Sequence, residues 1–203
     1  ASTARSSAGS GNIDGPLLEV RPRGRMTTIL HLIGPGGAGK TTVGPYLARR
    51  LGWAFVDLDQ HFMSREGNID AVIEASGYLG YARRNVAVYR EVRSALTSPT
   101  VLSLSSGFLT YPEGVEEGYP TLRCAIETDA LTSLLLPAFE LEACVEVTVQ
   151  RQLSRPYLRG DSASEERRIR ERFPKFMAMP CARFGSDAAP DDVASQIERL
   201  VRR

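Results

Sequence analysis

The sequence has no apolar run as long as the ~18 residues that a membrane span needs, and no apolar signal-peptide core lies near its start. It also lacks an excess of either charge, because 25 basic residues stand against 24 acidic ones and the formal net charge is +1. A strongly basic surface would favour nucleic acid or an anionic membrane as partner, and this balance favours neither. We therefore expect a cytoplasmic protein that binds no nucleic acid and no membrane.

Cysteine is scarce as well. The three residues, Cys124, Cys144 and Cys181, are an odd number at wide spacings. No C-x-x-C pair or Cys/His cluster accompanies them, so the usual structural zinc motifs are excluded. Buried, reduced thiols are the simplest interpretation, and they fit the reducing interior of a cell.

The first 25 residues are rich in serine, glycine and arginine and contain few apolar side chains. Such a segment cannot bury enough apolar surface to fold alone. We expect residues 1–25 to be a disordered tail, a tag remnant or a linker from another domain. Residues 26–203 have the length of one α/β domain.

From Met26 onward, β-rich apolar runs alternate with segments of helical periodicity. This alternation predicts a mostly parallel sheet with helices on both faces and a ligand at the carboxyl ends of the strands. His31, inside the first expected strand, is interpreted as a packed core residue. The expected strands are 27–33, 54–58, 100–104, 131–136 and 181–185, and the expected helices are 41–51, 69–76, 81–96, 141–153, 164–177 and 191–202.

Residues 34–41 read G-P-G-G-A-G-K-T and match the phosphate-binding loop pattern G-x-x-x-x-G-K-[ST] in full. An apolar strand precedes the motif and a helical pattern follows it. The glycines let backbone N–H groups converge on phosphate oxygens. Lys40 supplies charge for the β- and γ-phosphates of ATP, and the Thr41 hydroxyl is a hard ligand for Mg²⁺. The expected nucleotide contacts in this loop are Gly34, Gly36, Gly37, Ala38, Gly39, Lys40, Thr41 and Thr42.

Two carboxylates, Asp57 and Asp59, follow the second expected strand. We place both on the strand, where residues two apart face the same side and can point at one site. One carboxylate can hold magnesium through water, and the other can orient a hydroxyl or take its proton. Beside a P-loop, this pair predicts phosphoryl transfer to an alcohol.

Four segments in this order resemble the shikimate kinase family, among the nucleoside-monophosphate-kinase-like P-loop enzymes. They are the P-loop at 33–42, the D-x-D strand at 57–59, an R-P-Y-L segment at 155–158 that resembles the opening of a lid, and R-F-P-K-F at 172–176, which resembles R-x-P-x-Y. The resemblance covers residues 27–201. It implies a three-layer α/β/α fold, a five-stranded parallel sheet in the order 2-3-1-4-5, and a mobile lid from Arg155 to about Glu165.

The resemblance also implies roles for single residues. Asp57 lies near magnesium with Thr41, and Asp59 acts as the base on the acceptor hydroxyl. Arg155 joins Lys40 in neutralising the phosphates, and Arg172 binds a carboxylate of the acceptor. Next to adenine the resemblance places Arg151 and Pro190. The implied activity is ATP- and Mg²⁺-dependent phosphorylation of a small acceptor that carries a carboxylate and hydroxyls, by a monomer or weak dimer.

The acceptor half departs from the family. Where the family has G-E-x-x-F-R, residues 77–82 read G-Y-L-G-Y-A, so Ala82 replaces an arginine and Arg83 or Arg84 follows it. Asn85 stands where an acidic residue is usual. The family's triple glycine after the third strand is Ser105-Ser106-Gly107. The expected acceptor contacts are Asp59, Arg83, Ser105, Ser106, Gly107 and Arg172.

Two alternatives follow from these departures. The chain can be a kinase for a different metabolite alcohol, because its nucleotide half matches the family better than its acceptor half. It can also be a ligand-sensing P-loop module without catalysis, attached through the segment before Met26. The complete set of Lys40, Thr41, Asp57, Asp59 and Arg155 favours catalysis over sensing.

Overall fold

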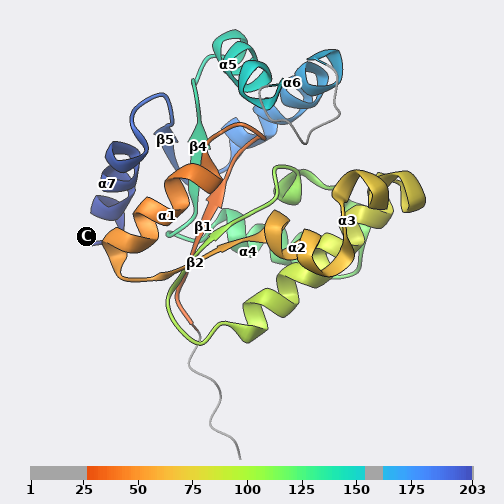
Figure 1. The fold of residues 1–203 in the computed structure, drawn as a ribbon, viewed down its shortest axis with the longest axis horizontal. Helices are drawn as coiled ribbons and strands as arrows, with labels where there is room; N and C mark the ends of the chain where they lie inside the picture. The colour runs from red at the N-terminus through yellow and green to blue at the C-terminus, as the bar shows by residue number, and fades with distance from the viewer. Residues whose placement is uncertain (1–26, 154–161, 203) are drawn as a thin grey trace, which may run out of the picture.

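The computed structural model describes residues 27–153 and 162–202. Its strands form one sheet in the order β2-β3-β1-β4-β5, and every neighbouring pair is parallel (Figure 1). The expected order 2-3-1-4-5 is thus confirmed. The strands are β1 (Ile29–Ile33), β2 (Ala54–Asp57), β3 (Thr100–Ser103), β4 (Ser133–Leu136) and β5 (Ala182–Gly185).

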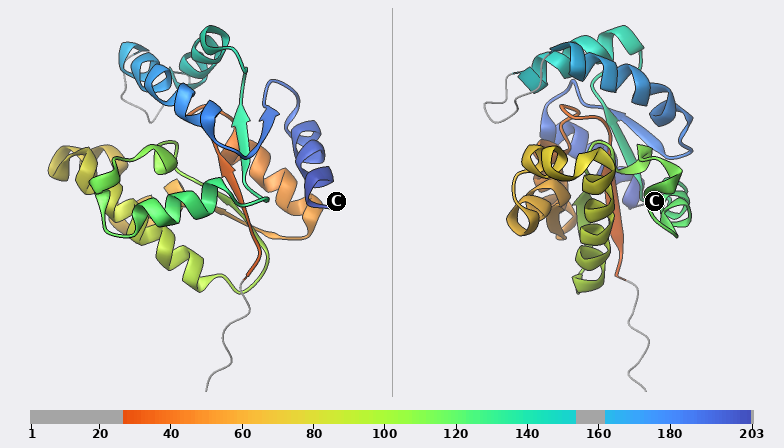
Figure 2. Two further views of the ribbon diagram at one scale, coloured as in Figure 1. Left: turned by 180° about the vertical axis from the view of Figure 1, so that it is seen from behind. Right: turned by 90° about the vertical axis from the view of Figure 1, so that its right-hand side faces the viewer.

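Helices cover both faces of the sheet, so the three-layer architecture is confirmed (Figure 2). The helix that follows the P-loop packs with the last helix on one face, and the long third helix and the fourth helix lie on the other (Figures 1 and 2). The fifth and sixth helices, which pack against each other, lie beyond the carboxyl ends of the strands (Figure 1). The helices are α1 (Lys40–Leu51), α2 (Leu58–Glu66), α3 (Ile69–Ala95), α4 (Tyr119–Glu127), α5 (Leu141–Leu153), α6 (Ser162–Ala178) and α7 (Pro190–Val201), with 3₁₀ turns η1 (Phe108–Thr110) and η2 (Glu113–Val115).

The core lies on both sides of β1, as its nearly continuous apolar sequence predicts. Leu30 and Leu32 face the α1–α7 layer, where they join Leu47 and Ile197. Ile33 belongs to the opposite cluster, which the α3–α4 side dominates. Within the described ranges, no helix combines the length and the apolar character that a membrane crossing needs.

Most expected elements are present, with three differences. The expected helices 69–76 and 81–96 belong to α3, which is interrupted at Gly77, where φ is +72°. Such a φ strains any residue with a Cβ, so glycine is suited to the break. The helices α2 and α4 were not expected, and α2 takes Asp59 out of the strand.

His31 is a packed core residue, as expected from the sequence. It is 4% exposed, and its Nε2 lies 3.0 Å from the hydroxyl oxygen of Tyr89 on α3. Burial outweighs the attraction of Asp129 and lowers the pKa of His31 to about 4. Because the unfolded chain protonates this imidazole at a higher pH, acid favours the unfolded state.

We expect His31 to make the protein lose stability as the pH falls from about 7 to about 5. The unfolded state binds a proton in this window and the folded state does not, which lowers the free energy of unfolding by about 2 kcal/mol. A His31→Gln variant lacks this contribution. Urea denaturation of both proteins at the two pH values measures the difference, and equal losses would show that His31 does not titrate in this way.

Candidate active site

The loop between β1 and α1 forms the phosphate cradle that the motif predicts. Gly34, Gly37 and Gly39 have positive φ values of 140°, 77° and 87°. A Cβ at Gly34 would lie 2.3 Å from the carbonyl oxygen of Leu135 in β4, so this position has no room for a side chain. A Cβ at Gly36 would lie 2.3 Å from Nε2 of Gln152 on α5. The loop is therefore packed tightly against β4 and α5.

Lys40 begins α1 and is 8% exposed. Its Nζ donates hydrogen bonds to the carbonyl oxygens of Gly34 at 2.7 Å and of Pro35 at 3.0 Å. The ammonium group therefore lies within the curl of the loop, where phosphate oxygens would bind.

Thr41 and Asp57, the two residues expected at magnesium, lie together. The Thr41 hydroxyl donates to Oδ2 of Asp57 at 3.0 Å, and Oδ1 of Asp57 accepts from the backbone N–H of Gln60 at 3.1 Å. Among the described residues there is no cluster of three or more metal-ligating His, Cys, Asp or Glu side chains. One hydroxyl and one carboxylate fit Mg²⁺, which takes few protein ligands beside water and phosphate oxygens.

The strand argument for Asp59 is wrong. Asp57 ends β2 and caps α2, and Asp59 lies in the first turn of that helix. Its position nevertheless brings it to the loop after β3, where the Ser105 hydroxyl donates to Oδ1 of Asp59 at 2.5 Å. Asp57 thus contacts the P-loop helix, and Asp59 contacts the β3 loop.

Ser105 is linked in turn to α3. Nδ2 of Asn85 donates to Oγ of Ser105 and to the hydroxyl oxygen of Tyr81, each at 2.9 Å. Burial, and after it the charge of Asp59, raise the pKa of the Tyr81 phenol, which therefore stays neutral. Asn85 is fully buried.

Arg172 of α6 reaches the same loop from the other side. Its Nη1 is 3.5 Å from Oγ of Ser106, and its Nη2 donates to the Tyr78 hydroxyl at 2.9 Å. A Cβ at Gly107 would lie 2.5 Å from the Tyr78 hydroxyl and 3.1 Å from Nη2 of Arg172. Glycine at this position therefore lets the two side chains meet over the loop.

The expected adenine contacts lie at the other side of the P-loop. Arg151 of α5 donates to the carbonyl oxygen of Gly37 at 3.2 Å and to that of Ser186 at 3.1 Å. Pro190 is the first residue of α7, a few residues after Ser186. The guanidinium of Arg151 thus joins the P-loop to the β5–α7 loop. Arg155 and most of the expected lid, residues 155–161, lie outside the described residues.

Arg83, one of the expected acceptor contacts, forms a hydrogen bond to η2 instead of to Asp59, Ser105 or Ser106. Its Nε donates to the carbonyl oxygen of Val115 in η2 at 2.7 Å, and Arg84 pairs with Glu66. Sequence reasoning gave no role to Tyr78, Tyr81 or Asn85. All three stand at or beside the departures from the family pattern, and that position is the signal by which they could have been found.

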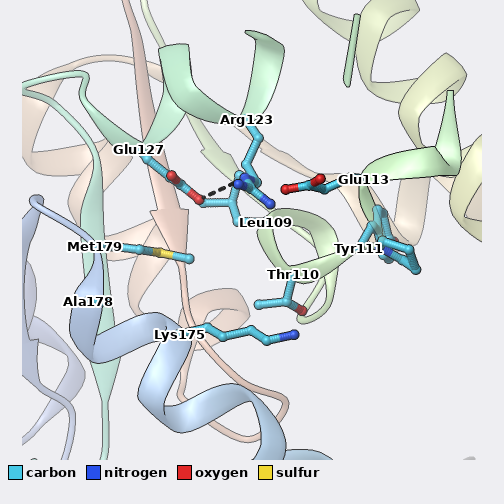
Figure 3. A pocket seen from close by; sticks show the side chains of 10 residues that line it. Leu109, Thr110, Tyr111, Glu113, Arg123, Glu127, Lys175, Ala178 and Met179 are labelled. Atoms are coloured by element: carbon cyan, nitrogen blue, oxygen red, sulfur yellow. Dashed lines mark ion pairs between the residues drawn. The ribbon is translucent and has the colours of Figure 1, made fainter. Parts of the chain in front are cut away.

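A cavity of about 610 Å³ lies between η1, α4 and α6 (Figure 3). Arg123 pairs with Glu127 at its edge at 3.4 Å, and Lys175 extends along it. None of the expected site residues lines this cavity. It is therefore separate from the group that joins Asp59, Ser105 and Arg172.

Comparisons with known proteins identify the family. The family model described as shikimate kinase matches residues 36–201. The shikimate kinase of Acinetobacter baylyi is 31% identical over 143 residues, which cover 70% of this chain and 71% of that protein. Shikimate kinase 2 of Salmonella paratyphi B is 29% identical over 177 residues, which cover 85% and 91%.

The fold agrees as well. The structure of shikimate kinase from Acinetobacter baumannii in complex with shikimate matches with a TM-score of 0.65 at 24% identity, covering 87% of this chain and 93% of that one. The structure from Bacteroides thetaiotaomicron matches with a TM-score of 0.66 at 20% identity. Because the family model matches residues 36–201, which are most of this chain, the chain belongs to the shikimate kinase family.

Proposed function

We propose that this chain is an ATP- and magnesium-dependent kinase that phosphorylates a hydroxyl group of shikimate or of a similar small carboxylated acceptor. The observation that supports this most is the junction between β2 and α2. There Asp57 contacts Thr41 of the P-loop helix, and Asp59, two residues later, contacts Ser105. In this proposal the phosphoryl donor and the acceptor hydroxyl meet between the two carboxylates.

The nucleotide half needs little covalent chemistry, because phosphoryl transfer depends on positioning and on neutralising charge. Backbone N–H groups of the P-loop bind the phosphates of ATP, and Lys40 neutralises the γ-phosphoryl group. Thr41 and Asp57 would hold Mg²⁺, which supplies positive charge to the phosphate oxygens when bound. The further proposed nucleotide contacts are Gly34, Gly36, Gly37, Ala38, Gly39, Thr42, Arg151, Arg155 and Pro190.

The acceptor half joins a carboxylate to a guanidinium. Asp59 would accept a hydrogen bond from the acceptor hydroxyl and take its proton as the hydroxyl oxygen bonds to the γ-phosphorus, while the bond from that phosphorus to the bridging oxygen breaks and ADP leaves. Arg172 would bind the acceptor's carboxylate through two parallel charge-assisted hydrogen bonds. Ser106 and Gly107 form the surface beneath them. The names of the relatives support an acceptor of the shikimate type.

A different metabolite alcohol is the second candidate, because alanine stands at position 82, where the resemblance leads us to expect an arginine for the acceptor's carboxylate. Ala82, at the position of the family's arginine, is completely buried in the core beside Val86. Asn85 replaces the usual acid and is also buried. Among the described residues, Arg172 is thus the cation that contacts the Ser106–Gly107 loop. An acceptor with one carboxylate and a changed hydroxyl pattern fits this arrangement.

We also place the reaction in the cytoplasm. Cys124, Cys144 and Cys181 are all free thiols, but the expectation that all three are buried is wrong, because Cys124 is exposed. Burial raises the pKa of Cys144 and of Cys181, which keeps these two in the unreactive thiol form. Free, unreactive thiols are usual in a reducing compartment.

We expect an Asp59→Asn variant to lose kcat by about 10²–10⁴-fold with its affinity for ATP little changed, because the amide keeps the size of the side chain but cannot accept the proton. Release of ADP in the presence of shikimate and a panel of carboxylated polyols measures the rate. Calorimetric titration with a non-hydrolysable ATP analogue is the control for nucleotide binding. An unchanged kcat would assign Asp59 to structure.

The variants Arg172→Met and Arg83→Met are expected to show which of these two arginines binds the acceptor's carboxylate. Loss of charge-assisted bonds at Arg172 should raise the acceptor's KM about ten- to a hundredfold. Arg83→Met should change that KM far less, because Nε of Arg83 is bound to Val115. Steady-state kinetics with the best acceptor provides the comparison. Equal increases in KM for the two variants would show that Arg83 also binds the acceptor.

A further inference from the structure

From the geometry we infer that Ser105 and Asn85 are positioning residues for the reaction, which act by fixing the carboxylate of Asp59. This inference rests on the proposed function and extends it to two residues that are not among the proposed catalytic residues Lys40, Asp59 and Arg155. It is carried by a directed chain of hydrogen bonds that runs from the buried amide of Asn85 to the carboxylate of Asp59.

The direction of the chain follows from its donors. Ser105 has a single hydroxyl hydrogen, and its oxygen already accepts from Nδ2 of Asn85 at 2.9 Å. The hydrogen of Ser105 is therefore free to point at Oδ1 of Asp59, 2.5 Å away. The second N–H of the Asn85 amide is bound to the oxygen of Tyr81, so the amide plane is fixed as well.

Burial strengthens this arrangement. Ser105 is 5% exposed and Asn85 is 0% exposed, so water does not compete for these bonds. A hydrogen bond to a charged acceptor is stronger than one between neutral groups, and more so where the surroundings are poorly polarisable. Asp59 itself is only half-buried. Its carboxylate is thus anchored at Ser105 without being fully enclosed.

A purely structural role explains Asn85 poorly. It lies on α3 among the core residues Tyr81, Ala82, Val86 and Tyr89, so much of its surroundings is apolar. Oδ1 of Asn85 is buried and has no hydrogen-bond partner in the described part of the chain. An unsatisfied buried acceptor costs about 1–3 kcal/mol. The amide of Asn85 therefore lowers the stability of the fold, and the orientation of Ser105 is what it provides in return.

The two residues also require each other. A carboxylate at position 85 would accept the hydrogen of Ser105 and compete with Asp59 for it. A glycine at position 105 would leave one N–H of Asn85 without its acceptor and Asp59 without this donor. Ser105 and Asn85 thus work as a pair, and both stand at departures from the family pattern.

Kinetics of Ser105→Ala, Asn85→Leu and the double variant tests the inference, with Ser105→Thr as the conservative variant that keeps the hydroxyl. Ser133→Ala is the matched control, because Ser133 is also fully buried and its Oγ has no partner among the described residues. We expect each single variant to lower kcat about tenfold, since misplacement of a reacting group has effects up to about 10²-fold. KM for ATP should stay within about twofold, and Ser133→Ala should keep the wild-type kcat.

The double variant shows whether Asn85 acts through Ser105. In that case it is no slower than Ser105→Ala alone, because the effects of residues that act as one unit do not add. Ser105→Thr should recover most of the lost kcat. A wild-type kcat in Ser105→Ala, or losses that multiply in the double variant, would overturn the inference.

Crystal structures of the same variants separate this inference from the proposed function. If no acceptor is phosphorylated by the unaltered protein, the kinase proposal fails, and the conformation of Asp59 still decides the positioning role. One conformer in the unaltered protein and in Ser133→Ala, with a changed or multiple conformer in Ser105→Ala, supports it. The same single conformer in all of them refutes it.

Discussion

The carboxylate of Asp57 makes the two contacts on which the site depends. One oxygen accepts from Thr41 and fastens the P-loop helix to the end of β2. The other accepts from the backbone of Gln60 and starts α2, which carries Asp59 in its first turn. Because one short side chain joins all three parts, the P-loop helix and Asp59 are held in a fixed relation. The parallel sheet brings them together, since the loops that carry them leave the same edge.

The two halves of the proposed site are built from different parts of the chain, one from the backbone and the other from side chains. The proposed nucleotide half consists of backbone and glycine geometry, which tolerates little change once β4 and α5 are packed against the loop. The proposed acceptor half consists of side chains from separate segments, namely Asp59, Arg172 and the Ser105–Gly107 loop, which Asn85 of α3 supports. Where a charge is lost, at Ala82 and Asn85, the space is filled by core packing and by neutral hydrogen bonds. The same fold can therefore keep its phosphate chemistry while its acceptor site changes.

Sequence reasoning reached the parts of this arrangement that are local or periodic. The P-loop is a contiguous motif, and the buried strands are apolar runs that can be recognised directly in the sequence. The short helix α2 was missed because only Leu58 and Phe62 are buried in it, too few to show helical periodicity. The link from Asn85 through Ser105 to Asp59 spans 20 and 46 positions in sequence. Such contacts depend on how β2, α3 and β3 are placed side by side, which no local pattern encodes.

The glycines of the cradle have a thermodynamic consequence for the whole chain. Gly34, Gly36 and Gly37 admit no side chain without a close contact, and two of them hold a left-handed backbone. Each glycine gives up more conformational entropy on folding than alanine would, about 0.5–1 kcal/mol, so three cost about 1.5–3 kcal/mol against a typical net stability of about 5–15 kcal/mol. The glycines of the P-loop thus lower the stability of the folded state, and the two packed cores on either side of β1 must offset this loss of free energy.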